Sequence, residues 1–577
     1  GLFFSVAQLA HEAFLAIVQW SLAVFFLLRN DVQQLRSDFR SLRAQLNISF
    51  NQYSYFNRVV IWTTLLFAFL LTLAPPFEAF DVLINHLAQP ATVLQHGGLQ
   101  AVNILPYWYP TLTESVYLWA LAMDSERAAQ MLHLAWGILA VLMLWRWSTR
   151  IWGTEIGRKT LLLVTAIPSL VMLASWAYVD MALCYYAVAA LYTLTLNREW
   201  KSGFPLTITA ILSGMAMGVK YQSFTIPLTC GLILLFERPI IKRFCSAFRF
   251  SLITLLIALP WYLRNAIFMG NPFYPFLFGG RYWDDFLAKW WTEAGTGIGW
   301  NLSQILMLPV NITLGYRDVT YFDGRFGPLY LLLLPMALWV LIFPGLQDSA
   351  KRFSLVSIGC FTALNFAAWT VGVINTSALW QARYLFPAVM AFSIPTALGW
   401  EAVHALDTAR LKVSFLVDTL IGLVLLLIVV DNGIFVIQRN PLSVALGIQS
   451  REQYIARVNP SYAALMSLMD QLPAKGRVYN LFEPRSYGLS QPVQPDVINS
   501  NFAHDAYLYK TPEEIIQHWK SEQYTHVLVY ERGLDFLSDT ASYKFTPATQ
   551  KILEETLGRL TLVGQTPDKV YSLYKIP

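Results

Sequence analysis

The segment FEAFDVLINH, residues 77–86, decides how the rest of the chain is interpreted. It follows an apolar run at 59–74 that is closed by two prolines, so a membrane helix would end directly before it. That helix would deliver two carboxylates, Glu78 and Asp81, and the imidazole of His86 to the bilayer surface. Ionisable groups at this depth are costly unless they pair, face a cavity or take part in chemistry. We therefore expect the remaining apolar segments to hold 77–86 against polar residues on the same side.

The composition is that of a membrane protein. Of 577 residues, 56% are hydrophobic and only 13% are charged, whereas soluble globular chains carry about 25% charged residues. The 20 tryptophans suit long segments at a membrane interface, where Trp and Tyr collect. The net charge of +5 is too small to indicate a nucleic-acid partner. The four cysteines form neither a disulfide framework nor a zinc-ligand spacing.

The apolar runs predict a polytopic α-helical protein with about 11–12 transmembrane helices. Spans of sufficient length lie near 59–76, 128–146, 160–177, 181–197, 203–219, 222–236, 248–263, 328–346, 353–373, 384–400 and 414–431, with a further one at 2–28. If these spans alternate, the clusters of Lys and Arg between them all fall on one side, as the positive-inside rule requires. Residues 1–58 are thus expected to form an extra membrane helix and a basic cytoplasmic segment, and 59–431 the main transmembrane domain.

Two long segments, about 77–127 and 264–327, fall on the opposite, extracytoplasmic side and are expected to hold short interfacial helices. After about residue 440 the composition changes, because charged and apolar residues alternate and no membrane-length run occurs. We interpret 440–577 as a small extracytoplasmic α/β domain. Strands are predicted at 477–481 and 526–530, and helices at 512–523 and 547–560.

Isolated polar residues at the ends of several spans meet at the same outer face on this topology. Asp180 ends one such segment, Lys220 lies between two apolar spans, and Arg264 and Arg383 lie at the ends of two others. A group of cations would suit a phosphate, whose oxygens bind Arg and Lys through charge-assisted hydrogen bonds. A carboxylate beside them would serve as a general base or a metal ligand.

The same stretches resemble the GT-C superfamily of integral membrane glycosyltransferases. Within it, the chain is similar to the bacterial phospholipid-carrier-dependent group related to protein O-mannosyltransferases and to the aminoarabinose transferases of lipid A. The stretches that carry the resemblance are Glu78, Phe80 and Asp81 with His86, AYVD at 177–180, GVKY at 218–221, PWYLRN at 260–265 with GNPFYP at 270–275, ARYLFP at 382–387, and FEPRSY at 482–487 in the tail.

The resemblance implies a GT-C-like fold and transfer of a sugar, with inversion, from a polyprenyl-phosphate carrier to an acceptor hydroxyl on the extracytoplasmic face. It places Asp81 as the catalytic carboxylate, with Asp180 and Glu78 as further acidic residues of the site. Asp81 and Asp180 would also hold a divalent metal ion, as in some members. Lys220 and Arg383 match the residues that bind the carrier phosphate.

The expected substrate-binding residues are His86, Lys220, Arg264, Arg383 and Tyr384. The expected partners are the lipid-linked donor, an acceptor that is a protein, lipid or glycan, and membrane lipids. The expected location is a bacterial inner membrane, as part of cell-envelope glycosylation. Residues 2–51 depart from the family pattern and are interpreted as an accessory helix or as a docking element for a partner subunit.

Simpler interpretations remain open for each residue. Asp81 could cap a helix or lie at the interface, Asp180 could cap the helix that begins at Met181, and basic residues at span ends routinely reach toward the headgroups. Arg264 could pair with an acidic residue. Two other functions are also considered for the whole chain: a transporter of a lipid-linked sugar, which would place polar residues near mid-span, and a catalytically silent scaffold subunit.

Overall fold

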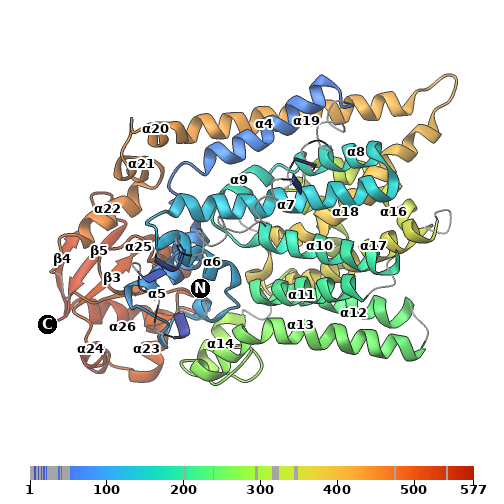
Figure 1. The fold of residues 1–577 in the computed structure, drawn as a ribbon. Helices are drawn as coiled ribbons and strands as arrows, with labels where there is room; N and C mark the ends of the chain where they lie inside the picture. Colours follow the sequence, from blue (N-terminus) through green and yellow to red (C-terminus); the bar gives the residue numbers. More distant parts are fainter. Residues whose placement is uncertain are drawn as a thin grey trace.

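The computed structural model describes residues 52–199, 203–237, 240–292, 296–314, 324–343, 348–473, 476–540 and 544–577, with isolated positions before 52. Apart from those positions, the predicted N-terminal membrane helix and the part of the basic segment before residue 52 lie outside the described residues. Long helices run side by side in one bundle, and a small α/β domain lies at one end of it (Figure 1). The fold class predicted from the sequence, a helical membrane protein with a C-terminal α/β domain, is confirmed.

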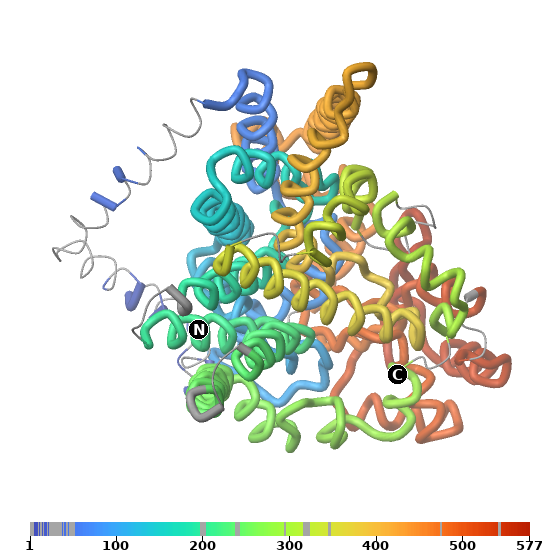
Figure 2. Tube along the Cα trace, turned by 90° about the vertical axis from the view of Figure 1, so that its right-hand side faces the viewer, coloured from blue at the N-terminus to red at the C-terminus, as the bar shows by residue number. Residues whose placement is uncertain are grey.

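The bundle is built from apolar helices. Its members are α4 (Tyr55–Leu71), α7 (Glu126–Trp152), α8 (Thr154–Thr165), α9 (Leu170–Ser175), α10 (Asp180–Glu199), α11 (Phe204–Val219), α12 (Thr225–Glu237), α13 (Ile240–Met269), α16 (Pro328–Ile342), α17 (Ser349–Asn375), α18 (Phe386–Ala402) and α19 (Val413–Arg439). Within the described residues, five helices are long and apolar enough to cross a membrane, and six shorter apolar helices accompany them. The helices α4 and α19 lie side by side along one edge (Figures 1 and 2).

One predicted span is interrupted. We expected a continuous helix over 160–177, but α8 ends at Thr165 and α9 begins only at Leu170. Pro168 lies between them, and proline has neither the N–H nor the space that a continuing helix needs. The prediction was wrong here because the apolar run continues through the break, so hydrophobicity does not mark it.

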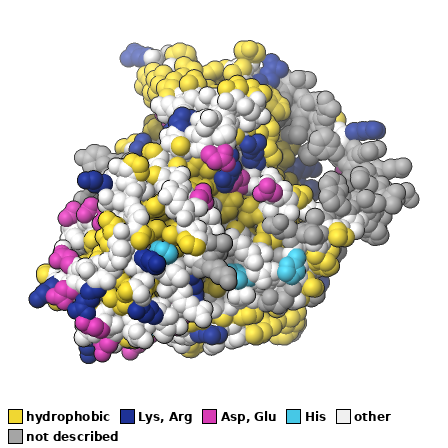
Figure 3. All heavy atoms as spheres, turned by 90° about the vertical axis from the view of Figure 1, so that its left-hand side faces the viewer, with side chains coloured by type: hydrophobic (Ala, Val, Ile, Leu, Met, Phe, Trp, Pro, Cys, Tyr) yellow, Lys and Arg dark blue, Asp and Glu magenta, His cyan; other side chains and the backbone are white. Residues whose placement is uncertain are grey.

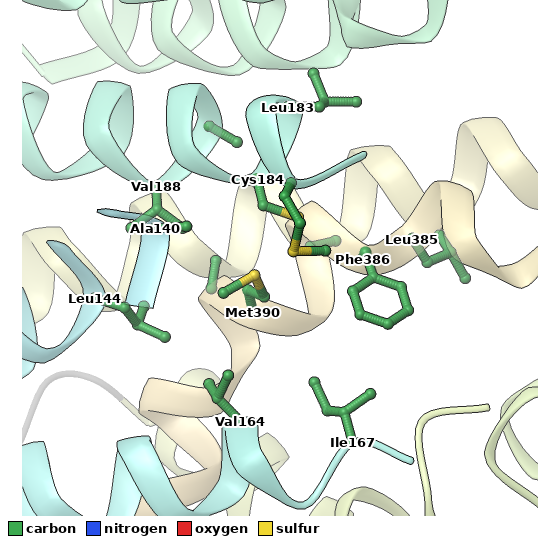
Figure 4. Packing of buried hydrophobic residues seen from close by; sticks show 14 of the residues in the cluster. Ala140, Leu144, Val164, Ile167, Leu183, Cys184, Val188, Leu385, Phe386 and Met390 are labelled. Carbon is green, nitrogen blue, oxygen red and sulfur yellow. The ribbon is translucent and has the colours of Figure 1, made fainter. Parts of the chain in front are cut away.

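The centre of the bundle lies where α7, α8, α10 and α18 meet. Leu144, Val164, Cys184, Phe386 and Met390 come from these four helices, are fully buried and pack together (Figure 4). Elsewhere small residues let helix backbones approach closely, as is usual in membranes. A Cβ atom on Gly214 of α11 would lie 2.6 Å from the carbonyl oxygen of Thr254 in α13.

Short helices fill the two segments that were expected outside the membrane. The first holds η1 (Val82–His86), α5 (Ala88–Gln95), η2 (Leu105–Trp108) and α6 (Leu112–Leu121), and the second holds α14 (Asp285–Thr292) and α15 (Leu302–Leu314). In the described part of the chain, single-turn helices follow or precede bundle helices at η3 (Tyr221–Phe224), η5 (Ser377–Leu379), η6 (Ala382–Leu385) and η7 (Val403–Leu406).

The C-terminal domain is a five-stranded sheet covered by helices. The strands β1 (Val478–Leu481), β2 (Val493–Gln494), β3 (His526–Tyr530), β4 (Thr561–Gln565) and β5 (Tyr571–Lys575) lie in the order β2-β1-β3-β5-β4. β1 is parallel to both β2 and β3, whereas β5 is antiparallel to β3 and β4. The helices are α20 (Pro441–Ala445), α21 (Arg451–Val458), α22 (Pro460–Met469), α23 (Asn501–Tyr509), α24 (Pro512–Ser521), α25 (Glu531–Thr540) and α26 (Pro547–Leu557).

Both predicted strands and both predicted helices of this domain are confirmed, within two or three residues at their ends. Val478 and Val527 are completely buried, as is Asn480, the polar residue of β1, so both strands lie in the interior of the domain. On the face that carries this domain, basic and acidic side chains are interspersed over the lower part, and hydrophobic side chains are dense above them (Figure 3).

Candidate active site

The segment that carries Asp81 and His86 is held by the C-terminal domain. Residues 82–86 form a single π-turn, in which the N–H of Leu87 donates to the carbonyl of Val82 at 3.1 Å. The N–H groups of Ser486 and Tyr487 both donate to the carbonyl of Leu83, at 3.0 and 3.1 Å. π-turns are rare and frequently occur at functional sites. Contacts from a distant domain therefore fix the conformation of this turn.

Asp81 is paired with a cation from the far end of the sequence. The Arg383 guanidinium, in η6, donates from Nη2 to Oδ2 of Asp81. Gln381 holds the same guanidinium, because its Oε1 accepts from Nε at 3.2 Å and from Nη2 at 2.8 Å. Arg383 is buried and lies 4.8 Å from the ring of Tyr178, while the Asp81 side chain is 30% exposed. Asp81 makes no helix-capping hydrogen bond, so its carboxylate is engaged by Arg383 rather than by the start of η1.

The charge state of Asp81 follows from its neighbours. Burial by itself raises the pKa of this carboxyl, but Arg383 foremost, and then His86 and Lys220, more than offset that effect and hold the pKa below its ordinary value. A nearby cation favours the charged form of an acid. Asp81 is therefore a carboxylate at neutral pH, and its basicity depends on whether Arg383 stays beside it.

A second acid–cation pair lies next to the first. Asp180 is the first residue of α10, and Lys220 directly follows α11. The Lys220 Nζ lies 3.9 Å from Oδ1 of Asp180 and 4.4 Å from the centre of the Tyr384 ring. Oδ2 of Asp180 is buried and has no hydrogen-bond partner among the described residues. A buried, unpartnered carboxylate oxygen is costly, so this atom is suited to a ligand group.

The turn before Asp180 is fixed by two buried side chains. The hydroxyl of Tyr117 donates to the carbonyl of Tyr178, and the N–H of Met181 donates to Nε2 of His133 at 3.0 Å. These contacts place the Tyr178 ring beside Arg383. They also fix the backbone at Asp180, the first residue of α10. His133 thus has a structural role.

His86 has a partner that the sequence interpretation missed. Its Nδ1 lies 2.7 Å from Oε1 of Glu114, and both residues are buried. The His86 ring also lies 5.5 Å from that of Tyr178. Glu114 is one acidic residue inside the apolar stretch LTESVYLWAL, which is a signal that could have identified it. A carboxylate on one ring nitrogen orients the imidazole and determines its tautomer.

Two predicted site residues are engaged elsewhere. The Glu78 carboxylate accepts from Nε of Arg439 at the end of α19, and burial, only partly opposed by Arg439, raises the pKa of Glu78. Arg264 is buried and donates to Thr111 at 2.7 Å, to the carbonyl of Tyr109 at 2.8 Å and to the neighbouring Asn265. Arg264 has neutral partners, not the acidic one considered, and it fastens α13 to the segment before α6. Neither residue is part of the Asp81 and Asp180 pairs.

The two carboxylates that we expected to bind a metal ion do not belong to a larger group of metal-ligating side chains among the described residues. Among the described residues, no three His, Cys, Asp or Glu side chains come together as a ligand set. Asp81 and Asp180, which we expected to share a divalent ion, instead each face a basic side chain. The divalent ion that Asp81 and Asp180 were expected to share therefore stays a prediction.

Comparisons with known proteins identify the fold. No family model and no curated protein matches the sequence. The solved structure of ArnT from Cupriavidus metallidurans in the apo state matches with a TM-score of 0.55 and 14% identity, over 90% of this chain and 97% of that one. The same protein bound to undecaprenyl phosphate matches with a TM-score of 0.52 and 13% identity, over the same shares. Archaeal oligosaccharyltransferase AglB from Archaeoglobus fulgidus is more distant, with a TM-score of 0.45 and 12% identity over 91% of this chain and 75% of that one. The predicted GT-C-like fold is confirmed.

Proposed function

We propose that the protein is an inverting glycosyltransferase that moves a sugar from a polyprenyl-phosphate carrier to an acceptor hydroxyl on the extracytoplasmic face of the membrane. The observation that carries this proposal is the pair of acid–cation contacts, Asp81 with Arg383 and Asp180 with Lys220, at one end of a bundle of apolar helices. They come from four segments far apart in the sequence. The fold shared with ArnT, which has been solved with undecaprenyl phosphate, supports a lipid phosphate as the ligand of the two cations.

The donor phosphate would bind between Arg383 and Lys220. Both cations already lie against the Tyr384 ring, with Lys220 at 4.4 Å and Arg383 at 5.9 Å from its centre. The donor phosphate is a diester with one negative charge, like the carboxylate of Asp81, but its oxygens would contact both Arg383 and Lys220, so it would compete with Asp81 for Arg383. Loss of the cation raises the basicity of the carboxylate. Binding of the donor would thereby prepare Asp81 to accept a proton.

The chemical step is a direct displacement. Asp81 takes the proton of the acceptor hydroxyl, and the hydroxyl oxygen forms a bond to the anomeric carbon of the sugar. The bond from that carbon to the phosphate oxygen breaks, and the carrier phosphate keeps the electron pair. Arg383 and Lys220 stabilise the charge that develops on the phosphate. The unpartnered oxygen of Asp180 and the imidazole of His86, oriented by Glu114, are suited to hold hydroxyls of the reacting sugar and acceptor.

A direct experiment is sugar transfer in liposomes from a panel of labelled undecaprenyl-phosphate sugars, with envelope extract as acceptor. The proposal expects label to move to a non-lipid or glycolipid product with the wild-type protein and not with Asp81→Asn. Passage of the lipid-linked sugar across the bilayer without transfer would instead support a transporter. If the protein shows neither transfer nor transport with any donor of the panel, the scaffold role is the better explanation.

The proposed orientation has its own test. If the site faces outward, the C-terminal domain from about residue 440 is extracytoplasmic, since it holds the turn that carries Asp81. Protease added to right-side-out vesicles should remove it. A domain that is protected there, and cleaved in inverted vesicles, would place the site on the cytoplasmic side and contradict the proposed location.

A further inference from the structure

A cleft lies apart from the two acid–cation pairs. It has a volume of about 950 Å³ and lies between the C-terminal domain and the two segments expected outside the membrane. Residues 96–105 and 274–287 line one side, and β1, the chain around β2, and α23 and α24 line the other. In Figure 1 these elements surround the junction of the bundle with the α/β domain. None of the residues of the proposed active site lines the cleft.

The walls of the cleft are joined by direct contacts. Gln494 on the edge strand β2 donates from Nε2 to the carbonyl of Asn103 at 2.7 Å. His504 on α23 lies 2.8 Å from a carboxylate oxygen of Asp284. The Tyr282 hydroxyl donates to the carbonyl of Ala101 at 3.1 Å. These contacts link the domain to both outer segments, so the cleft is formed before any ligand arrives.

Aromatic rings line both sides. Tyr282, which is 38% exposed, and Trp283 belong to one wall, and Tyr509 belongs to the other, where its ring stacks on that of His518 with 4.5 Å between centres. At the base, Tyr479 and Tyr524 lie 4.8 Å apart. A ligand that binds here would therefore lie beside aromatic side chains from both walls.

The polar groups of the cleft are mostly neutral hydrogen-bonding groups. Gln100, Asn103, Gln494 and Asn501 supply amides, although the Nε2 of Gln494 and the Nδ2 of Asn501 already donate to backbone carbonyls of Asn103 and Asn480. The Arg477 side chain donates to the carbonyl of Glu522 and lies over the Tyr524 ring, so it is engaged within the domain. A lining with several carboxylates and one guanidinium offers no concentration of cations for a phosphate and no apolar channel for a lipid tail.

Aromatic faces together with amides match the chemistry of a sugar chain. Each pyranose ring presents C–H groups that pack on an aromatic face and hydroxyls that both donate and accept hydrogen bonds. Ligand sites generally combine aromatic walls with a few placed polar groups in a volume of about 300–1,000 Å³. The cleft is within that range and is large enough for several sugar units.

The cleft is also connected to the proposed active site through the protein. β1, which carries Tyr479 at the base of the cleft, leads into residues 483–487. The backbone of Ser486 and Tyr487 in that segment holds Leu83 in the turn with Asp81 and His86. A chain bound in the cleft would therefore lie on the same side of the bundle as the reacting groups.

We propose that this cleft binds a neutral oligosaccharide, namely the part of the acceptor that is remote from the reacting hydroxyl. The proposal rests on the proposed function only in assigning the bound chain to the acceptor. The binding itself depends on the cleft alone, and a glycan acceptor is thereby preferred over a protein or lipid one.

The experiment is binding of the full-length protein, purified in detergent, to an array of neutral and anionic glycans and to a peptide array, without any donor. Wild type should bind neutral oligosaccharides of several units and not the peptides. Tyr282→Ala and Tyr509→Ala should each weaken that binding by about five- to tenfold, since each removes one aromatic contact. Tyr282→Phe and Tyr509→Phe keep the rings and should bind nearly as well as wild type.

Tyr507→Ala is the matched control. Tyr507 is on the same helix as Tyr509 and is 56% exposed, but it does not line the cleft, so its removal should leave glycan binding unchanged. Thermal unfolding of every variant separates loss of the site from loss of the fold. Binding of peptides in place of glycans, binding of anionic glycans alone, absence of any glycan binding, or wild-type binding by both alanine variants would each overturn the proposal.

Two further results separate this proposal from the proposed function. Asp81→Asn should bind the neutral oligosaccharides as wild type does, because Asp81 does not line the cleft. If transfer occurs but the cleft variants transfer and bind normally, the glycan site is refuted and the transferase is retained. If glycans bind the cleft and no donor supports transfer, the transferase is refuted and the glycan site is retained.

Discussion

Two acid–arginine pairs in this molecule differ in how far the carboxylate is buried and hydrogen-bonded. In the C-terminal domain, Glu483 is completely buried, and its two oxygens accept from the backbone N–H and guanidinium of Arg485 and from the hydroxyl of Tyr571, at 2.6–2.8 Å. Asp81 in the bundle accepts from Arg383, yet its side chain remains 30% exposed. The first pair joins residues two apart in the sequence, and the second joins residues 302 apart.

The comparison shows what distinguishes a structural ion pair from one suited to chemistry. Glu483 and Arg485 satisfy each other and the surrounding polar groups, so exchanging either partner would strand a buried charge. Asp81 is partly open to solvent, and its arginine lies beside a second cation. An incoming anion can therefore compete for Arg383 without unfolding anything.

Asp81→Asn should give the largest effect on activity. The amide keeps the shape of the carboxylate but cannot accept a proton at neutral pH, and loss of a general base typically lowers the rate about 10²–10⁴-fold. The initial rate of sugar transfer measures it. Thermal unfolding is measured beside the rate, because Arg383 is buried and loses its counter-ion, although Gln381 still accepts from its guanidinium. A variant that transfers at nearly the wild-type rate would remove Asp81 from the mechanism.

Glu483→Gln should act on stability instead. It leaves the charge of Arg485 buried without its counter-ion, which typically costs about 3–5 kcal/mol. Denaturant unfolding of the full-length protein, followed by proteolysis of the C-terminal domain, measures this loss. Glu513→Gln is the control in the same domain, because its partner Arg559 is exposed and such pairs contribute about 0–1 kcal/mol. Equal stability of the two variants would contradict the contrast between closed and open pairs.

Arg383→Ala and Lys220→Ala should each weaken binding of undecaprenyl phosphate by about 1.5–3 kcal/mol, the range for hydrogen bonds to charged groups. Titration calorimetry with the protein in nanodiscs can measure the change. Arg439→Ala serves as the control, since Arg439 is paired with Glu78 and should leave binding unchanged. If all three variants bind the lipid equally, the phosphate site is misplaced. If only Arg439→Ala weakens binding, the site lies near Glu78.

Asp505 is a buried acid for which no cation is named as a partner, and it extends the comparison to a third case. Its effect on the stability of the domain should be the most gradual, because it develops with pH. Burial raises the pKa of Asp505 to about 7, although the Trp519 N–H donates to it. A folded-state pKa above the unfolded value of about 4 means that the stabilisation is complete below pH 4. It is lost as the pH rises to about 7, at a slope of at most about 1.4 kcal/mol per pH unit.

Unfolding of the C-terminal domain between pH 4 and 8, followed by fluorescence, would test this dependence on pH. Asp505→Asn should flatten the profile over that range, because the amide does not titrate. A domain that becomes more stable as the pH rises would show that Asp505 is ionised and paired in the folded state.

The sequence by itself determined the helical membrane fold and the small α/β domain. Apolar runs of membrane length and the distribution of Lys and Arg are local signals, since a bilayer requires long apolar helices whatever they pack against. The buried strands around Val478 and Val527 were also predicted, because short runs rich in valine and tyrosine mark them. The order of motifs along the chain also pointed to Asp81, Asp180, Lys220 and Arg383 as a group.

Only the tertiary structure decided which of these residues become partners. Glu78 and Asp81 are three residues apart and look alike in sequence, yet one is paired with Arg439 and the other with Arg383. Glu114 beside His86 depends on how α6 packs, and the π-turn at 82–86 depends on contacts from residues 486–487. Hydrogen bonds and ion pairs act over a few ångströms in space. Their partners are therefore determined by helix packing, which brings together residues that no local pattern in the sequence connects.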